Sequence, residues 1–163
     1  MNSKDAICSS ANFSMMVLKS YISDLDDADL LKRPAAGCNH IAYQLGHLIN
    51  SEAQLLNMVS PETKVELPEG FAETYSKENA SDDNAEHFLD KASYVELLDK
   101  VRGTTLATLD SYPEADLDKD APEAMRNFCP TMGDLFTLIA THPLMHAGQF
   151  VIVRRQLGKP ILM

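Results

Sequence analysis

Apolar residues recur with helical spacing in four stretches of the chain. The stretches cover about residues 6–23, Asn39 to about Ser60, the segment that follows Ser93 and the segment that follows Thr131. Positions three and four apart lie on one face of a helix, so each stretch predicts an amphipathic helix with that face toward a core. Because no stretch alternates with the period of two that is typical of strands, the pattern predicts an all-α protein.

The apolar stripes also give the residues that we expect to face the core. In the first helix they are Phe13, Met16, Val17, Ser20 and Tyr21. In the last helix they are Leu135, Leu138, Ile139, His142, Met145, His146, Gln149, Val153 and Leu157. In the second helix an unusually polar stripe adjoins the apolar face, and it consists of His40, Tyr43, Gln44, His47 and Ser51.

Capping residues indicate where the helices begin and end. Ser93 with Glu96, three residues later, fits a capping box for the third helix, and Thr131 with Asp134 has the same spacing for the fourth. Asn39 is a plausible cap for the second helix. Glycine is common just after the last residue of a helix, and Gly158 predicts the end of the fourth.

Two long polar connections separate the predicted helices. Residues 61–90 contain nine acidic residues and two lysines, and we expect them to form a solvated crossover. Residues 114–130 form a second acidic loop with two prolines. Four helices with two such connections predict a four-helix bundle with long crossover connections. The length of 163 residues predicts one domain, residues 1–163.

Composition narrows the classes of function. The formal net charge of −10 disfavours nucleic acid and anionic membrane surfaces as partners, since both need clustered Lys and Arg. No apolar run approaches the ~20 residues of a membrane span, and the N-terminus lacks the apolar core of a signal peptide. Cys8, Cys38 and Cys129 are scattered and form no C-x-x-C motif, which favours reduced thiols. We therefore expect a cytoplasmic protein.

The most specific chemical signal is the pair His142 and His146, which lie four residues apart in the last predicted helix. Imidazoles one helical turn apart can hold one metal ion, as H-x-x-x-H helices do. The alternative is two core histidines that are hydrogen-bonded to protein groups. His47, on the inward side of the second helix, joins the pair if these two helices face each other. Three imidazoles with open positions are typical of a catalytic metal site.

Other residues near these histidines carry weaker signals. His40 lies two turns before His47, where it could line the mouth of a cavity or begin the helix, and His87 is expected at the surface. Pro143 lies between the paired histidines and predicts a kink, because it removes a helical hydrogen bond and clashes with the carbonyl of the residue four before it. Gln149, one turn beyond His146, is a candidate hydrogen-bond partner for a ligand. Glu52 is expected to point away from the histidines.

The arrangement of these motifs resembles the DinB-like superfamily. Residues 39–48, with the sequence NHIAYQLGHL, are similar to the signature of its second helix. Residues 142–150 (HPLMHAGQF) and 154–160 (RRQLGKP) are similar to its last helix. The motifs occur in the expected order, and the resemblance spans about residues 11–160.

The resemblance implies a four-helix bundle that holds a divalent metal through three histidines, which correspond here to His47, His142 and His146. It implies nickel, zinc or iron as the metal, water at the open positions, and a homodimer. Some members of the superfamily are S-transferases that use the low-molecular-weight thiols bacillithiol or mycothiol, and one branch isomerises maleylpyruvate with mycothiol. The chain departs from the superfamily at Tyr43, where tryptophan is common, and at Pro143. Both departures affect the shape of the pocket and therefore the substrate.

Two functions follow from this reading. The first is a metal-dependent thiol S-transferase or hydrolase that acts on a small-molecule substrate or a thiol. The second is a non-enzymatic stress protein that binds a metal or a small ligand, which the absence of an evident general base favours. A bundle whose histidines serve only the core, and which acts as a dimerisation module, leaves the coincidence of three histidines unexplained.

Overall fold

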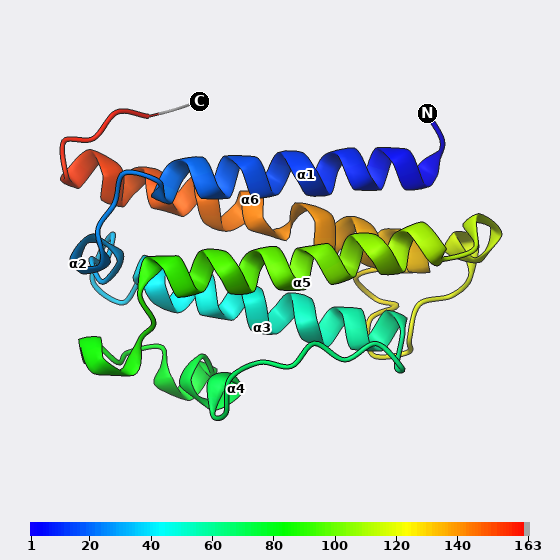
Figure 1. Ribbon diagram of the computed structural model, residues 1–163, viewed down its shortest axis with the longest axis horizontal. Coiled ribbons are helices and arrows are strands. Elements are labelled where there is room, and N and C mark those ends of the chain that lie inside the picture. Colours follow the sequence, from blue (N-terminus) through cyan, green and yellow to red (C-terminus); the bar gives the residue numbers. More distant parts are fainter. Residues whose placement is uncertain (162–163) are drawn as a thin grey trace.

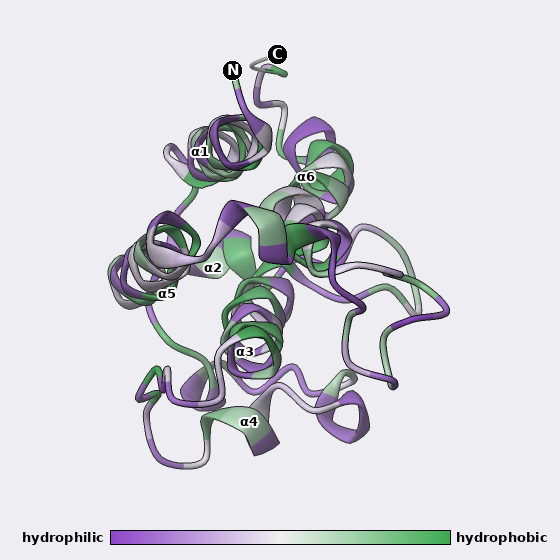
Figure 2. Cartoon of the chain, turned by 90° about the vertical axis from the view of Figure 1, so that its right-hand side faces the viewer, coloured by the Kyte–Doolittle hydropathy of each residue, from purple (hydrophilic) through white to green (hydrophobic). Residues whose placement is uncertain are grey.

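The computed structural model describes residues 1–161, and within that range it confirms the all-α four-helix bundle. The long helices are α1 (Ser3–Ile22), α3 (Ile41–Val59), α5 (Lys91–Ser111) and α6 (Met132–Gln156). Figure 2 shows them nearly end-on around a common interior, with the short helix α4 (Phe71–Thr74) on the outer side of α3. The core of the bundle is formed by apolar residues from all four long helices.

The directions of the helices explain the long connection between α3 and α5. Helices α1 and α6 lie side by side and run in the same direction, while α3 and α5 run in the opposite direction (Figure 1). The chain must therefore return along the whole bundle between α3 and α5. The returning segment contains α4, η1 (Lys77–Asn79) and η2 (Ala85–His87). The other connections contain α2 (Asp27–Leu30) and η3 (Glu114–Asp118).

The capping box predicted at Thr131 and Asp134 is present, with both reciprocal hydrogen bonds formed. The other two predicted caps were wrong by one and three residues. His40, not Asn39, caps α3, because its Nδ1 accepts the backbone N–H of Tyr43. Asp90, not Ser93, caps α5, because its carboxylate accepts the N–H of Ser93 at 2.7 Å and is the stronger acceptor.

The predicted core faces of α1 and α6 were correct only in part. Phe13 and Met16 are about half exposed, and the buried face of α1 is formed by neighbouring positions, among them Ala11, Ser14 and Leu18. In α6 the side chain of Met145 is 66% exposed. Both predicted core faces are slightly rotated about the helix axis relative to the observed ones. Apolar residues surround much of each helix, so the pattern leaves its inward direction ambiguous.

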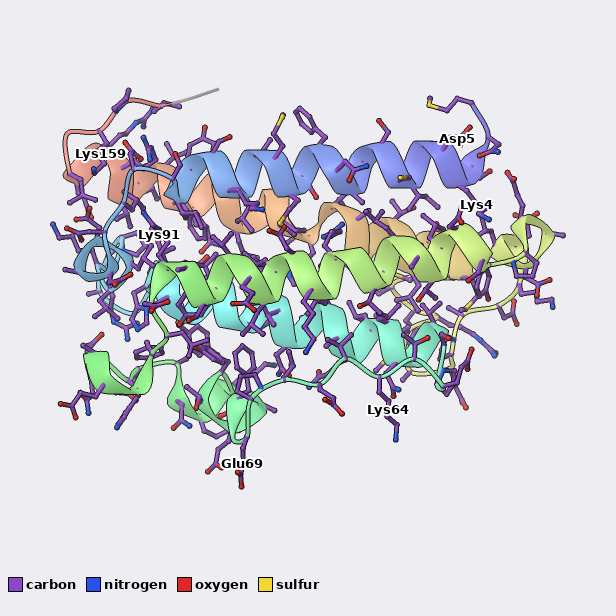
Figure 3. The ribbon with its side chains drawn as sticks, in the orientation of Figure 1. Lys4, Asp5, Lys64, Glu69, Lys91 and Lys159 are labelled. Carbon is purple, nitrogen blue, oxygen red and sulfur yellow. The ribbon has the colours of Figure 1, made fainter. Side chains whose placement is uncertain are left out.

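Aromatic residues anchor the returning segment to the bundle, so it is not the purely solvated connection that was expected. Phe71 and Tyr75 are buried, and the hydroxyl of Tyr75 lies 2.6 Å from that of Tyr94 on α5. The ring of Tyr75 lies against Gly46 of α3, where a Cβ would overlap it. The acidic and basic residues of the segment face outward, as Lys64 and Glu69 do in Figure 3. The segment is therefore charged outside and aromatic inside.

Helix α6 is long and apolar enough, by length and composition, to cross a membrane, with a mean hydropathy of 1.3 in its most apolar window. One such helix is weak evidence for a membrane span, because the core helix of a bundle passes the same test. In the bundle Leu135, Ile139 and Phe150 of this helix are buried in the core. Packing within the bundle is thus sufficient to account for its apolar character.

A buried arginine fixes the register of α6 against the end of α1. Arg154 is fully buried, and it donates to the carbonyl oxygen of Tyr21 and to both carboxylate oxygens of Asp24. These hydrogen bonds lower the pKa of the Asp24 carboxyl. These contacts fix the position of α6 along the axis of the bundle relative to α1. They therefore also fix the level at which the histidines of α6 lie.

Candidate metal centre

The structure brings the three predicted histidines together between α3 and α6. The ring centroid of His47 lies 5.5 Å from that of His142 and 5.3 Å from that of His146. One ring nitrogen from each residue lies within 4.8 Å of the other two. All three side chains are half-buried, so the cluster can be reached from solvent.

The spacing of the nitrogens suits a metal ion. The two Nε2 atoms of His142 and His146 are 3.2 Å apart. Two nitrogens bound to a tetrahedral ion with bonds of about 2.0–2.1 Å lie about 3.3 Å apart. The third nitrogen, from His47, lies within 4.8 Å of both, and within residues 1–161 no carboxylate belongs to the cluster. The donor set is therefore three imidazoles with positions left for water or a substrate.

Burial keeps these imidazoles neutral, which is the form that binds a metal. It lowers the pKa of His47 and of His142, and it lowers the pKa of His146 to about 3. The ammonium group of Lys77, in the returning segment, lowers the pKa of His47 further. At neutral pH all three rings therefore offer a lone pair without first losing a proton.

Gln44, rather than the expected Gln149, is the hydrogen-bond partner of a candidate ligand. Its Oε1 lies 2.8 Å from Nδ1 of His146, and its side chain is 2% exposed. Gln149 is exposed on the outer face of α6. The signal that could have identified Gln44 was its place in the polar stripe of the second helix, between His40 and His47.

Pro143 lies within α6, and the helix continues through it. Proline lacks the N–H that would bond to the carbonyl oxygen of Ile139, and its ring pushes on the preceding turn. Donors from two other helices contact this turn, and one of them reaches the Ile139 oxygen. Arg102 of α5 donates to the Ile139 oxygen at 3.3 Å, and the Ser14 hydroxyl of α1 donates to the oxygen of Ala140 at 2.5 Å. The turn that leads into His142 and Pro143 is thus supported from both sides.

Tyr43 forms one wall beside His47. The two rings are stacked with centroids 6.5 Å apart and an interplanar angle of 8°. The Tyr43 hydroxyl donates to the carbonyl oxygen of Ser76, so the returning segment is tied to the same wall next to Lys77. Tyr43 therefore links the cluster to the segment that borders it.

The remaining candidates lie outside the cluster. His40 begins α3 and contacts the carbonyl oxygen of Asp82 through Nε2, so of its two expected roles it has the one at the helix start. His87 is exposed and pairs with the Asp82 carboxylate, as expected of a surface residue. The carboxylate oxygens of Glu52 both accept hydrogen bonds from α5, one from Arg102 and one from Thr105. Glu52 is thus engaged by the neighbouring helix.

Comparison with known proteins gives a family and a fold. A family model described as the DinB superfamily matches residues 13–150. No curated protein matches the sequence. A conserved protein from Enterococcus faecalis has a similar structure, with a TM-score of 0.76 and 15% identity over 98% of this chain and 99% of that one. YfiT from Bacillus subtilis, described as "a probable metal-dependent hydrolase with an unusual four-helix bundle topology", has a TM-score of 0.64 and 17% identity over 96% of this chain and 89% of that one. At these identities the two structures support the fold alone.

Proposed function

Because this chain belongs to the DinB superfamily, we propose that it binds a divalent metal ion through His47, His142 and His146 and hydrolyses a small-molecule substrate there. The observation that carries the proposal is the convergence of three neutral imidazoles from α3 and α6, with no carboxylate among them. The description of YfiT as a metal-dependent hydrolase supports the choice of reaction. Nickel, zinc and iron are the candidate metals.

The residues of the chain divide the work of such a site. A divalent ion held by three imidazoles would supply a water molecule of lowered pKa at an open position. His47 and the pair on α6 offer nitrogens from two facing helices, which would hold the ion between them. Tyr43 covers one side of His47. Lys77 places a positive charge near the cluster, where it can attract an anionic group of a substrate.

Metal binding can be tested before any substrate is known. Untagged protein is analysed for bound elements, then melted with a chelator and with Zn²⁺, Ni²⁺ or Fe²⁺ alone. An ion at 100 times its Kd stabilises the folded state by about 2.7 kcal/mol, so the melting temperature should rise. His47→Ala should abolish the rise, while His87→Ala, which removes an exposed histidine, should retain it. A rise of equal size in both variants, or no rise with any of the three ions, would refute the site.

The reaction is tested with the metal-loaded protein against a panel of esters and amides. Hydrolysis that His47→Ala removes and His87→Ala preserves is the expected result. The panel also includes a low-molecular-weight thiol with an electrophile, because metal coordination favours the thiolate. Turnover of that pair without hydrolysis would replace the hydrolase proposal by thiol S-transfer at the same site.

A second candidate function is a non-enzymatic metal- or ligand-binding protein. The observation that favours it is the absence of a carboxylate from the cluster, together with the engagement of Glu52 by Arg102 and Thr105. The cluster then contains no side chain, apart from its three candidate metal ligands, that could act as a general base. Metal binding without turnover of any substrate in the panel would favour this candidate.

A further inference from the structure

Gln44 is the only residue outside the histidine cluster whose side chain is hydrogen-bonded to a ring nitrogen of the cluster within residues 1–161. We infer that Gln44 is a positioning residue, which holds His146 in the tautomer protonated on Nδ1 and thereby leaves Nε2 to bind the metal ion. The inference rests on the proposed metal site and adds to it which nitrogen of His146 is the ligand. It also explains why α3 carries a buried amide side chain, that of Gln44, in its polar stripe.

The backbone before α3 fixes the orientation of the Gln44 side chain. The Nε2 group of Gln44 donates to the carbonyl oxygen of Asn39 at 2.8 Å. A carbonyl oxygen can only accept, so the NH₂ end of the amide must face Asn39. This oxygen is available because α3 begins at Ile41, which leaves Asn39 outside the helix. The opposite end of the amide, Oε1, then faces His146.

The orientation of the amide determines the tautomer of His146. Oε1 can only accept, so Nδ1 of His146, at 2.8 Å, must carry the proton. A neutral imidazole has one N–H, so its other nitrogen, Nε2, carries a lone pair, which can accept from Nε2–H of His142 in the metal-free protein. That atom lies 3.2 Å from Nε2 of His142, on the side of the ring where the cluster converges. The hydrogen bond thus directs the lone pair of His146 toward the other ligands.

The opposite tautomer would place a proton where the metal must bind. To accommodate it, the Gln44 amide would have to rotate, and its oxygen would then face the carbonyl oxygen of Asn39. Because Gln44 is buried, water could not compensate for that contact. The histidine is therefore prepared for metal before any metal arrives. Partners of this kind commonly strengthen metal binding by about 10- to 100-fold.

The tautomer can be measured without metal. Two-bond ¹H–¹⁵N correlation spectra of chelator-treated protein at neutral pH distinguish protonation of Nδ1 from protonation of Nε2. The original chain should show His146 protonated on Nδ1. Gln44→Leu should shift His146 toward the Nε2-protonated form. Gln44→Glu should retain the original form, because one carboxyl oxygen accepts from Nδ1 while the other, protonated in this buried site, donates to the carbonyl oxygen of Asn39. Gln149→Leu, at the exposed glutamine of α6, is the matched control and should change nothing.

Metal affinity is the second readout, measured by competition of Zn²⁺ with a chromophoric chelator. Gln44→Leu should weaken binding by about 10- to 100-fold, and Gln44→Glu and Gln149→Leu should stay within a few-fold of the original. Thermal melts of the chelated proteins identify any variant that fails to fold, and Gln44→Glu keeps the test valid in that case. An unchanged tautomer and unchanged affinity in Gln44→Leu would overturn the inference while the metal site stands. An original chain that binds none of Zn²⁺, Ni²⁺ and Fe²⁺ but shows the Gln44-dependent tautomer would instead refute the proposed function alone.

Discussion

Arg102 and Ile139 are joined by a hydrogen bond from α5 to α6, in which the guanidinium donates to the carbonyl oxygen at 3.3 Å. This oxygen is the one that Pro143 leaves without its helical partner. The same Nη2 group donates to the buried carboxylate of Glu52 at 2.9 Å. Nε and Nη1 of Arg102 are buried without a partner among the described residues, so the burial of this cation has a cost. Its position is best explained by the two acceptors that it satisfies.

A double-mutant cycle between Pro143 and Arg102 tests this compensation. Arg102→Met alone should reduce the free energy of unfolding by about 3–5 kcal/mol, because it leaves Glu52 buried without its counter-charge. In the Pro143→Ala background the loss should be smaller by about 1 kcal/mol, since the introduced alanine supplies an N–H to the Ile139 oxygen. The measurement is urea unfolding of the four proteins. The effect of Glu52 cancels in the cycle, so additive losses would exclude the coupling.

Ser14 supports the same turn of α6 from the opposite side. Its hydroxyl donates to the carbonyl oxygen of Ala140 at 2.5 Å and is fully buried. Ser14→Ala should lower the free energy of unfolding by about 1 kcal/mol, because it removes a buried hydrogen bond between α1 and α6. Ser10→Ala is the control, since that hydroxyl bonds only within α1, to Ala6. Similar losses in chemical denaturation for the two variants would show that the contact with α6 contributes nothing.

At Gly46 the returning segment packs directly against α3, through the ring of Tyr75. Gly46→Ala should destabilise the fold by about 1–3 kcal/mol and release the segment, because the added Cβ overlaps the Tyr75 ring. Limited proteolysis within residues 61–90 should accelerate. Gly103→Ala, in α5, is the matched control, since a Cβ there meets nothing within 4 Å. It should be neutral or stabilising, and protection of the segment that is equal in both variants would contradict the proposed anchor.

The sequence predicted the elements of the bundle better than their rotation. Spacing, capping and glycine placement are local signals, so α6 was predicted to begin after Thr131, as it does. Which face of α1 points into the core depends on where the neighbouring helices lie. The sequence of residues 9–16 alone does not contain that information. His142 and His146 were identified from their spacing of four residues, and His47 from its place on the inward side of the second helix. Both of these signals are local.

The partners that support the cluster could not be found in the same way. Arg102 of α5 lies far in sequence from Ile139, and nothing in its own neighbourhood indicates that it will be buried. Gln44 was visible as part of a polar stripe, but its role depends on the carbonyl of Asn39 and on a histidine far along the chain. Long-range pairing of this kind follows from the packing of the helices. It is therefore the structure that distinguishes Gln44 from Gln149.

The histidine cluster should make the metal-free protein sensitive to mild acid. Burial lowers the pKa of His47 and His142 from about 6.5 and that of His146 to about 3. The unfolded chain therefore takes up protons below pH 6.5 that the folded chain does not, and stability falls as the pH falls. Urea unfolding in chelator at pH 7.5, 6 and 5 measures this slope. Carboxylates with lowered pKa values contribute mainly below about pH 5. Burial raises the pKa of the Glu52 carboxyl, which favours the folded state as the pH falls and so opposes the effect of the histidines.

Variants at single histidines test whether the cluster causes this dependence of the free energy of unfolding on pH. His146→Gln should reduce the loss of stability between pH 7.5 and pH 5, because it removes the group with the largest shift. Part of the loss should remain, since burial also lowers the pKa of His40. Gln149→Leu, at an exposed residue of the same helix that carries no titratable group, should leave the slope as it is. Equal slopes in the original chain and in His146→Gln would mean that the cluster is not kept neutral by burial, and that a metal must first displace protons from it.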